Sequence, residues 1–233
     1  MGHVFEGLWV QDHLPHGQLT GRWLGKYVGG FKGSPHTPEW PLVRDGKGRW
    51  EGRNGDTYEG QWKDDYYDGL GTLRTKFASY EGAFWKSMRH GYGVLVASNG
   101  DWYEGYFAHD KFDGQGQRSD KSGVYMGQWL DGLRHGTGSF TTHSGVKHVG
   151  RWYKGARHGD GEMVYPDGSK FKGEFEADEK AGDGAFQDGY APPGTEIAYS
   201  GGYRDGVRHG DQATFDGASA RAHTCSRACR RPA

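Results

Sequence analysis

The sequence predicts an all-β protein built from about nine successive β-hairpins, and three observations support that fold class. A unit of two aromatic residues, four positions apart with Gly midway between them, recurs along nearly the whole chain. Two further Gly follow the second aromatic residue, seven and nine positions beyond it. Glycine supplies 43 of the 233 residues while hydrophobic residues make up 33%, an inventory that suits a thin aromatic-lined sheet. Repetition at this period predicts units that bury their apolar faces against one another.

The repeat keeps its register over most of the chain. Six of the eight intervals between unit starts are 22 or 23 residues long. Six units, from the one at Tyr58 to the one at Phe171, carry both glycine intervals without a change. The end units depart more from the pattern, as terminal units that cap an array often do. The units begin at Phe5, Tyr27, Tyr58, Tyr80, Tyr103, Tyr125, His148, Phe171 and Tyr199.

Two longer intervals and a basic tail define the domain organisation. An insertion at about residues 32–45 contains three Pro, and an excursion at about residues 187–198 contains two more. Both are therefore expected at the surface rather than inside the sheet. We assign residues 1–217 to the repeat array and residues 218–233 to a flexible C-terminal tail. The tail has no acidic residue and four basic ones, Arg221, Arg227, Arg230 and Arg231.

Strand alternation explains the residue types within one unit. Residues two apart in a strand share a face, so Tyr80, Gly82 and Phe84 point the same way. The Gly pair on the following strand lacks side chains and leaves slots in which neighbouring rings can lie. We therefore interpret the paired glycines as packing positions. They are Gly69, Gly71, Gly91, Gly93, Gly114, Gly116, Gly136, Gly138, Gly159, Gly161, Gly182 and Gly184.

Two kinds of bend are expected in the hairpin array. Turns between units are indicated by dipeptides that favour positive φ. Those dipeptides are Asn54-Gly55, Asn99-Gly100, Ser122-Gly123, Ser144-Gly145 and Asp167-Gly168. Bends within units are expected where Arg-His-Gly recurs, at residues 89–91, 134–136, 157–159 and 208–210.

At this point the chain resembles a known family. The segments Tyr58-Glu59-Gly60-Gln61-Trp62, Tyr80-Glu81-Gly82-Ala83-Phe84 and Tyr103-Glu104-Gly105-Tyr106-Phe107, each followed by a Gly-x-Gly pair, are similar to the MORN (membrane occupation and recognition nexus) repeat. The resemblance covers about residues 4–217. It implies an elongated, single-layer, twisted antiparallel sheet of successive hairpins. For function it implies less, because the family includes axonemal scaffolds, membrane-junction proteins, cytoskeletal adaptors and domains attached to kinases.

The histidines do not predict a metal centre. Equivalent residues in adjacent hairpins lie two strands apart, about 9–10 Å, whereas two imidazoles on one zinc ion must each come within about 2.1 Å of it. We expect turn-shaping or solvent-facing roles for His16, His90, His135, His158 and His209. Cys225 and Cys229, with His223, would be a better ligand cluster, but we expect reduced thiols in the flexible tail.

No pattern predicts an enzyme or a cofactor. The Gly-x-Gly pairs would fall inside strands, whereas a phosphate-binding loop needs backbone N–H groups at a strand-to-helix junction. Carboxylates such as Glu59, Glu81 and Glu104 recur with the repeat, mostly on the face opposite the rings. Catalysis needs a single asymmetric constellation, so we expect no catalytic residues.

The charge balance and the number of cysteines limit which partners and which cellular compartment are expected. With 29 Lys and Arg against 30 Asp and Glu, the chain has no basic bias for nucleic acid. Its longest aliphatic run, Val94–Ala97, is far shorter than the roughly 20 residues of a membrane span. The first unit begins at once after Met1, so no signal peptide is expected. Two cysteines, both in the tail, indicate a reducing compartment.

The aromatic face is the candidate site. A single-layer sheet has no second layer to cover that face, and contiguous exposed apolar surface usually marks a partner site. A helix or extended segment of another protein could lie along it, with strand pairing at an end edge as the next possibility. The candidate groove residues are Tyr80, Phe84, Tyr103, Phe107, Tyr125, Trp129 and Trp152.

The leading functional hypothesis is a non-enzymatic structural protein, a rigid adaptor within a large cytoskeletal assembly. The resemblance to short, repeat-only MORN proteins implies a cytoplasmic or cytoskeletal location, at the cilium or flagellum axoneme and including radial spokes. One alternative is a peripheral membrane module that binds anionic phospholipid through the Arg-rich tail. Against it, four Arg supply only about 1 kcal/mol each near an anionic surface. Another alternative is a regulatory module of a separate enzyme.

Overall fold

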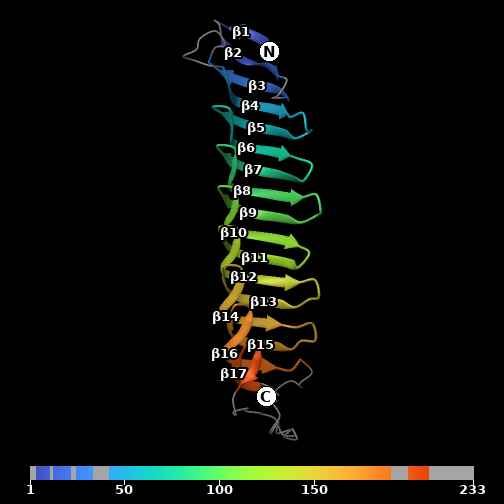
Figure 1. Cartoon of the computed structure of the whole chain (residues 1–233), viewed down its shortest axis with the longest axis vertical. Helices are drawn as coiled ribbons and strands as arrows, with labels where there is room; N and C mark the ends of the chain where they lie inside the picture. The colour runs from blue at the N-terminus through green and yellow to red at the C-terminus, as the bar shows by residue number, and fades with distance from the viewer. Residues whose placement is uncertain (1–3, 11–12, 22–24, 34–41, 190–198, 210–233) are drawn as a thin grey trace, which may run out of the picture. The chain divides into compact units, whose positions relative to one another are not determined.

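The computed structural model describes residues 4–10, 13–21, 25–33, 42–189 and 199–209. These residues form eighteen strands and no helix, which confirms the predicted all-β class (Figure 1). Accordingly, no helix able to cross a membrane occurs in the described ranges. Pro35, Pro38 and Pro41 of the expected insertion lie outside the described residues, as do most of the excursion at 187–198 and the whole tail at 218–233.

The chain divides into two compact units, which we describe separately. The first contains Met1–His143 and Trp152–Gly155, and the second contains Ser144–Arg151 and Ala156–Ala233. The first unit holds β1 Val4–Val10, β2 His13–Gly21, β3 Gly25–Lys32, β4 Val43–Glu51, β5 Thr57–Lys63, β6 Tyr66–Arg74, β7 Ala78–Trp85, β8 Met88–Ala97, β9 Trp102–Ala108, β10 Lys111–Asp120, β11 Gly123–Leu130 and β12 Leu133–Thr142. The second holds β14 Ala156–Val164, β15 Lys170–Glu176, β16 Glu179–Gln187, β17 Tyr199–Arg204 and β18 Val207–His209. Strand β13, Lys147–Tyr153, has residues in both units.

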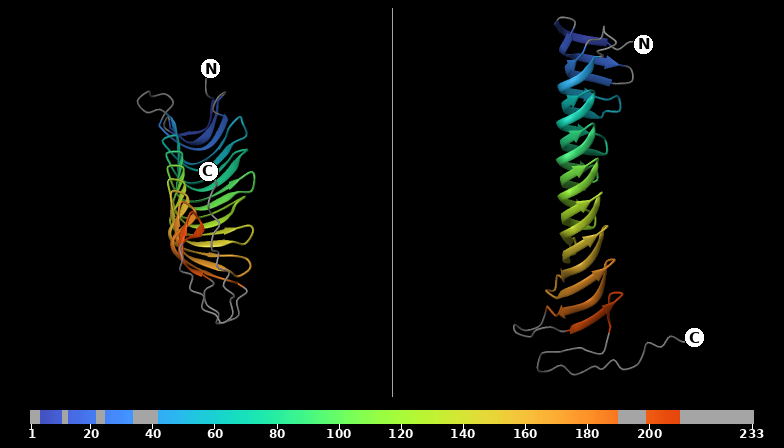
Figure 2. Two further views of the ribbon diagram at one scale, coloured as in Figure 1. Left: turned by 60° about the horizontal axis from the view of Figure 1, so that its bottom comes forward. Right: turned by 90° about the vertical axis from the view of Figure 1, so that its left-hand side faces the viewer.

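Within each unit the strands form an open antiparallel sheet in chain order. In the first unit every strand from β1 to β11 pairs with the next one along the chain. In the second unit the same holds from β14 to β18. Figure 2 shows consecutive strands side by side, curving across each sheet. Two strands per repeat give the nine hairpins that the periodicity predicts.

In the repeats from β5 onward, the chain reverses at a two-residue turn that the sequence does not predict. Between β7 and β8 the turn residues are Lys86 and Ser87, with φ of 47° and 65°. Two successive positive φ values define a type I′ turn, whose twist matches that of the flanking strands. The Arg-His-Gly segments were expected to form these bends, and that expectation is wrong. Residues 89–91 lie inside β8, after the turn.

Residues 89–91 instead belong to a bulge. Gly82 pairs with Gly93 and Phe84 pairs with Arg89. Between these two pairs the chain advances by two residues in β7 and by four in β8. The additional residues bend β8, and Gly91 takes a positive φ of 67° there. The same two-against-four shift occurs at β3/β4, β5/β6, β9/β10, β11/β12 and β15/β16. The seven-residue interval in the repeat therefore contains one turn and one bulge.

Turns between repeats follow the prediction at four of the five dipeptides, whereas at the fifth the turn residues are Lys121 and Ser122, and Gly123 is the first residue of β11. Gly55, Gly100, Gly145 and Gly168 all have φ between 85° and 90°. The backbone N–H of Gly100 donates to the carbonyl of Ala97, and that of Gly168 donates to Tyr165, which closes a tight turn in each case. Glycine is needed there because other residues rarely adopt this backbone region.

The core of the first unit is a ladder of aromatic rings on one face of the sheet. In the repeats from Tyr27 to Tyr125, the first ring contacts the second ring of its own repeat and the second ring of the next one edge-to-face. Centroid separations are 4.9–5.6 Å and interplanar angles 79–89°. Each first-position Tyr hydroxyl also donates to the carbonyl three residues later, for example Tyr80 to Ala83 at 2.9 Å. These contacts join each repeat to its neighbour.

The second unit has a smaller ladder with two exceptions to the tyrosine rule. Phe171, Phe175, Tyr199 and Tyr203 form its buried cluster. His148 takes the first-ring position, is 2% exposed, and meets Phe175 edge-to-face at 4.8 Å. His148 and Phe171 thus stand where most of the repeats have Tyr, and they lack the hydroxyl that donates to a backbone carbonyl in those repeats.

Candidate partner-binding surface

The structure brings the seven candidate groove residues together in one cluster and buries them. Tyr80, Phe84, Tyr103, Phe107, Tyr125, Trp129 and Trp152 are only 1–5% exposed. Their contacts are mainly with one another, and the indole N–H groups of Trp129 and Trp152 donate to the carbonyls of Gly116 and Gly138. The rings themselves therefore offer a partner little surface.

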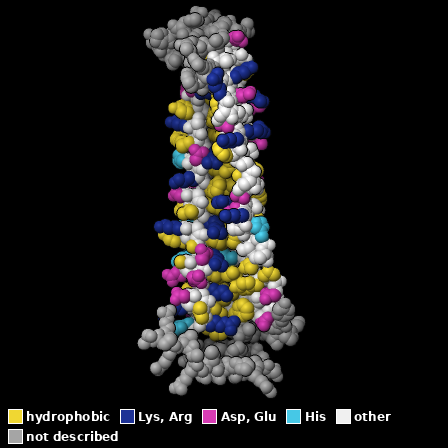
Figure 3. Space-filling model, turned by 45° about the vertical axis from the view of Figure 1, so that its right-hand side comes forward, with side chains coloured by type: hydrophobic (Ala, Val, Ile, Leu, Met, Phe, Trp, Pro, Cys, Tyr) yellow, Lys and Arg dark blue, Asp and Glu magenta, His cyan; other side chains and the backbone are white. Residues whose placement is uncertain are grey.

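Arginine side chains help to cover the rings, although the sheet has no second layer. Arg89 in β8 donates through Nε to the Asp110 carboxylate at 2.8 Å, and its guanidinium lies 5.4 Å from the Phe107 ring centroid. The Asp110 N–H donates back to the Arg89 carbonyl at 3.0 Å. Figure 3 shows Lys and Arg side chains alternating with hydrophobic ones along the sheet. The Arg-to-Asp clamp recurs at Arg44 with Asp65 and at Arg157 with Asp178.

The paired glycines have two different roles, so the interpretation of both as packing slots is half right. A Cβ added to Gly93 would lie 2.6 Å from ring carbons of Tyr80, so the second position has the geometry of a slot for the ring. At the first position, a Cβ on Gly91 would meet only the Ala83 Cβ, at 3.3 Å. Gly91 is instead required by its positive φ in the bulge. Positive φ also occurs at Gly69, Gly114, Gly136, Gly159 and Gly182.

The opposite face carries a groove whose floor is a row of glycines. Register pairs Gly71 with Gly82 and Gly82 with Gly93, and the row continues through the whole first unit. On this face the backbone of these residues forms the floor, and the side chains of the residues before and after each glycine rise on either side of it. The groove has a volume of about 880 Å³ and extends from β2 to β8. The row comprises Gly7, Gly17, Gly29, Gly48, Gly60, Gly71, Gly82, Gly93, Gly105, Gly116, Gly127 and Gly138.

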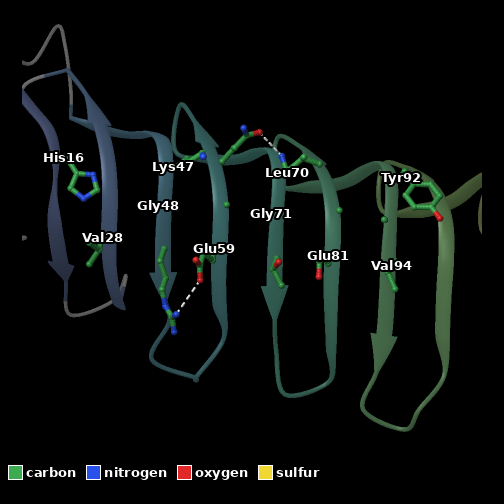
Figure 4. Close-up of a pocket in the computed structure, with 16 residues that line it drawn as sticks. His16, Val28, Lys47, Gly48, Glu59, Leu70, Gly71, Glu81, Tyr92 and Val94 are labelled. Atoms are coloured by element: carbon green, nitrogen blue, oxygen red, sulfur yellow. Dashed lines mark hydrogen bonds and ion pairs between the residues drawn. The ribbon is translucent and has the colours of Figure 1, made fainter.

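The two walls of this groove differ in chemistry. Leu70 and Tyr92 stand on one side, 66% and 50% exposed, and Glu59 and Glu81 stand on the other (Figure 4). Beyond its end, Tyr106 is 51% exposed and meets Tyr92 edge-to-face at 5.5 Å. Exposed apolar area of the first unit is therefore concentrated opposite the ring ladder, in contrast to the expectation from the single-layer argument.

Sequence reasoning missed these groove residues although the signal was present. Leu70 and Tyr92 occupy the position between the paired glycines, and alternation places that position on the face opposite the rings. The same rule had placed Glu59, Glu81 and Glu104 there. What alternation could not give is the alignment of these side chains from strand to strand, which depends on the register of the sheet.

The second unit has a groove of the same construction. It is lined by the glycine row Gly161, Gly173 and Gly184 and has a volume of about 570 Å³. Its walls are more acidic, with Asp160, Glu162 and Asp183 and a single Lys172. The same scaffold thus presents different side chains in the two units.

Burial and hydrogen bonding shift the pKa of several tyrosines on the two faces. Burial raises the pKa of Tyr80 and of Tyr125 to about 12, with smaller opposing effects from Arg89 and Arg134. The Tyr92 hydroxyl donates to Glu104 at 2.7 Å, and this bond raises the pKa of Tyr92. Within the described ranges, no group of three or more His, Cys, Asp or Glu could hold a metal ion. Cys225, Cys229 and His223 lie outside those ranges.

The histidines expected at bends have separate surroundings. His90 lies beside His109, with ring centroids 5.5 Å apart, and both contact the Trp85 ring. His135 contacts Tyr153, while the side chains of His16, His158 and His209 are exposed.

Comparison with known proteins identifies the repeat. A family model described as the MORN repeat matches residues 58–75, 80–102, 103–124, 125–147, 148–170 and 199–210. These segments together cover about half of the chain. A search of curated proteins gives no match to the chain.

Proposed function

Because the chain belongs to the MORN-repeat family, we propose that it is a non-enzymatic adaptor that holds partner proteins within a cytoskeletal assembly. The observation that carries the proposal is the glycine-floored groove with exposed Leu70, Tyr92 and Tyr106. Aromatic residues are enriched where proteins meet, because they supply large apolar area with a polar tip. The buried ring ladder supports this surface as a rigid frame.

We further propose that the assembly lies in the cilium or flagellum, at the axoneme, with the radial spoke as one instance. The support is analogy with short repeat-only members of the family, which is an argument at the level of the fold. In this role the array acts as a spacer whose repeats present binding side chains at regular intervals.

Proximity labelling with the full chain in ciliated cells tests the proposal. We expect axonemal proteins among the labelled partners, and we expect deletion of residues 218–233 to leave that labelling intact. Substituting both Leu70→Ser and Tyr92→Ser should weaken it strongly, because losing one central anchor typically costs at least about 2 kcal/mol of binding. Leu133→Ser is the matched control, since Leu133 is 48% exposed beside the β11–β12 turn and outside the groove.

The opposite pattern would reject the adaptor role. Labelling confined to membrane proteins, lost on deletion of residues 218–233 and unaffected by the groove substitutions, would favour anionic lipid as the target. Moderate salt would then also release the protein, because surface charge is screened within about 10 Å at 0.1 M.

A further inference from the structure

Two glutamates of the groove, Glu59 and Glu81, form a single straight row across five strands with Glu104, which lies one strand beyond the end of the groove. Register pairs Glu59 with Thr72, Thr72 with Glu81, Glu81 with Val94, and Val94 with Glu104. One glutamate therefore stands on every second strand, and all three are exposed. Adjacent glutamates are separated by two strand spacings, about 9.6 Å.

The row has an acidic excess towards β9. Arg49 lies 3.5 Å from Glu59, and Lys47, Lys63 and Arg74 are the other cations of this face on β4–β6. On β7–β9 the one Lys or Arg is Arg89, which stacks over the rings of the opposite face. Glu81 therefore faces a segment of groove without Lys or Arg, and Glu104, beyond its end, accepts a hydrogen bond from the Tyr92 hydroxyl.

The groove is too narrow for a helix to enter. Its two walls are side chains of residues two apart in one strand, about 6.8 Å along the chain, whereas a helix with its side chains is about 10–12 Å wide. A helix that contacts with residues seven apart would place charges about 10.5 Å apart, and the mismatch with the glutamate row grows at each step. A polyproline II helix repeats every three residues, or about 9.3 Å, which nearly equals the glutamate spacing.

From this match we infer that the groove binds a polyproline II segment carrying Lys or Arg at every third residue. Each cation meets one glutamate of the row. The apolar residues between the cations contact Leu70, Tyr92 and Tyr106, in the way that proline-rich segments dock between aromatic side chains. The inference rests on the proposed role of this groove as a partner-binding surface and specifies the chemistry of the partner.

Fluorescence anisotropy with the full chain and a labelled peptide of repeated Arg-Pro-Pro units tests the inference. The competitor has the same composition, but its arginines are contiguous at one end. We expect the repeated peptide to bind at least about fivefold more tightly, because only its charges can pair with all three glutamates. The double variant Glu81→Gln, Glu104→Gln should weaken its binding by about two- to twentyfold. The double variant Glu51→Gln, Glu176→Gln, an equal charge change on exposed residues outside both grooves, should leave it unchanged.

Three results would each overturn the inference. They are equal affinity for the two peptides, unchanged affinity of the double glutamine variant, and equally tight binding of a helical peptide with Arg at every seventh residue. These outcomes are separable from failure of the adaptor role. Proximity labelling that still finds axonemal partners, and still depends on Leu70 and Tyr92, would keep the adaptor function while removing this partner chemistry.

Discussion

Substituting Gly93→Ala should displace the Tyr80 ring from its slot. The new Cβ would lie 2.6 Å from ring carbons of Tyr80, against about 3.5–4.0 Å for an ordinary carbon contact. The ring cannot yield without loss, because Tyr80 is 2% exposed and its hydroxyl is bonded to Ala83. It also packs edge-to-face on Phe84 at 4.9 Å and on Phe107 at 5.1 Å.

The expected cost follows from the contacts that the ring would lose. The hydrogen bond contributes about 1 kcal/mol, and each edge-to-face pair about 0.5–1.5 kcal/mol beyond area burial. Alanine in a strand recovers about 0.5–1 kcal/mol relative to glycine. We therefore expect the free energy of unfolding to fall by about 1–3 kcal/mol, which is the usual range for overpacking. Urea denaturation followed by tryptophan fluorescence should show a lower midpoint.

A double-mutant cycle isolates the slot from general strain. Tyr80→Leu removes the ring that overlies Gly93, so adding Gly93→Ala should then cost at least about 1 kcal/mol less than it does alone. The matched control combines Tyr80→Leu with Gly138→Ala, whose slot holds Tyr125 instead. That pair should be additive, since the sites lie five strands apart, about 24 Å. An unchanged midpoint for Gly93→Ala, or additivity in the first cycle, would refute the slot.

Three further substitutions test the ladder and its clamps. Tyr125→Phe removes the 3.0 Å bond to the Gln128 carbonyl and should cost about 1 kcal/mol in denaturant unfolding below pH 10. The cost should shrink from pH 10 towards 12, because the parent protein loses stability there and the Phe variant does not. The unfolded phenol ionises near pH 10, whereas burial raises the pKa of folded Tyr125 to about 12. A constant cost across that window would contradict the assignment. Asp110→Asn should lower the free energy of unfolding by up to about 1 kcal/mol. Asp113→Asn, which lies outside the Arg89 clamp, should lower it less. His148→Tyr should raise the stability of the second unit by about 1 kcal/mol, because the new hydroxyl can donate to the residue-151 carbonyl. Hydrogen exchange in β14 and β15 measures this gain, and unchanged exchange would contradict the prediction.

The parts of the fold that were predictable depend on local rules. Alternation placed Tyr80 and Phe84 on one face, and turn chemistry placed Gly55 and Gly100 at positive φ. The type I′ turn at Lys86 and Ser87 was not predictable, because neither residue favours positive φ by itself. The pairing of the flanking strands imposes that turn.

The candidate site was less predictable because burial is a property of neighbouring repeats. The pattern correctly grouped the rings, but their cover includes arginines such as Arg89, held by a carboxylate 21 residues further along. Pairing across that separation cannot be read from a single repeat. The alignment of side chains along the opposite groove likewise needs the register of the sheet, including the two-residue bulge concealed within the seven-residue interval.

The residues that stabilise the fold and the residues that are exposed to a partner lie on opposite faces of the sheet. Residues that define the repeat, the rings and the second glycine of each pair, are occupied by packing on one face. The residue between the paired glycines projects from the other face and is free of those constraints. It varies from Leu70 and Tyr92 through Gln115 and Thr137 to Asp160 and Asp183. Family membership therefore determines the scaffold, while the partner is encoded in positions that the repeat pattern does not specify.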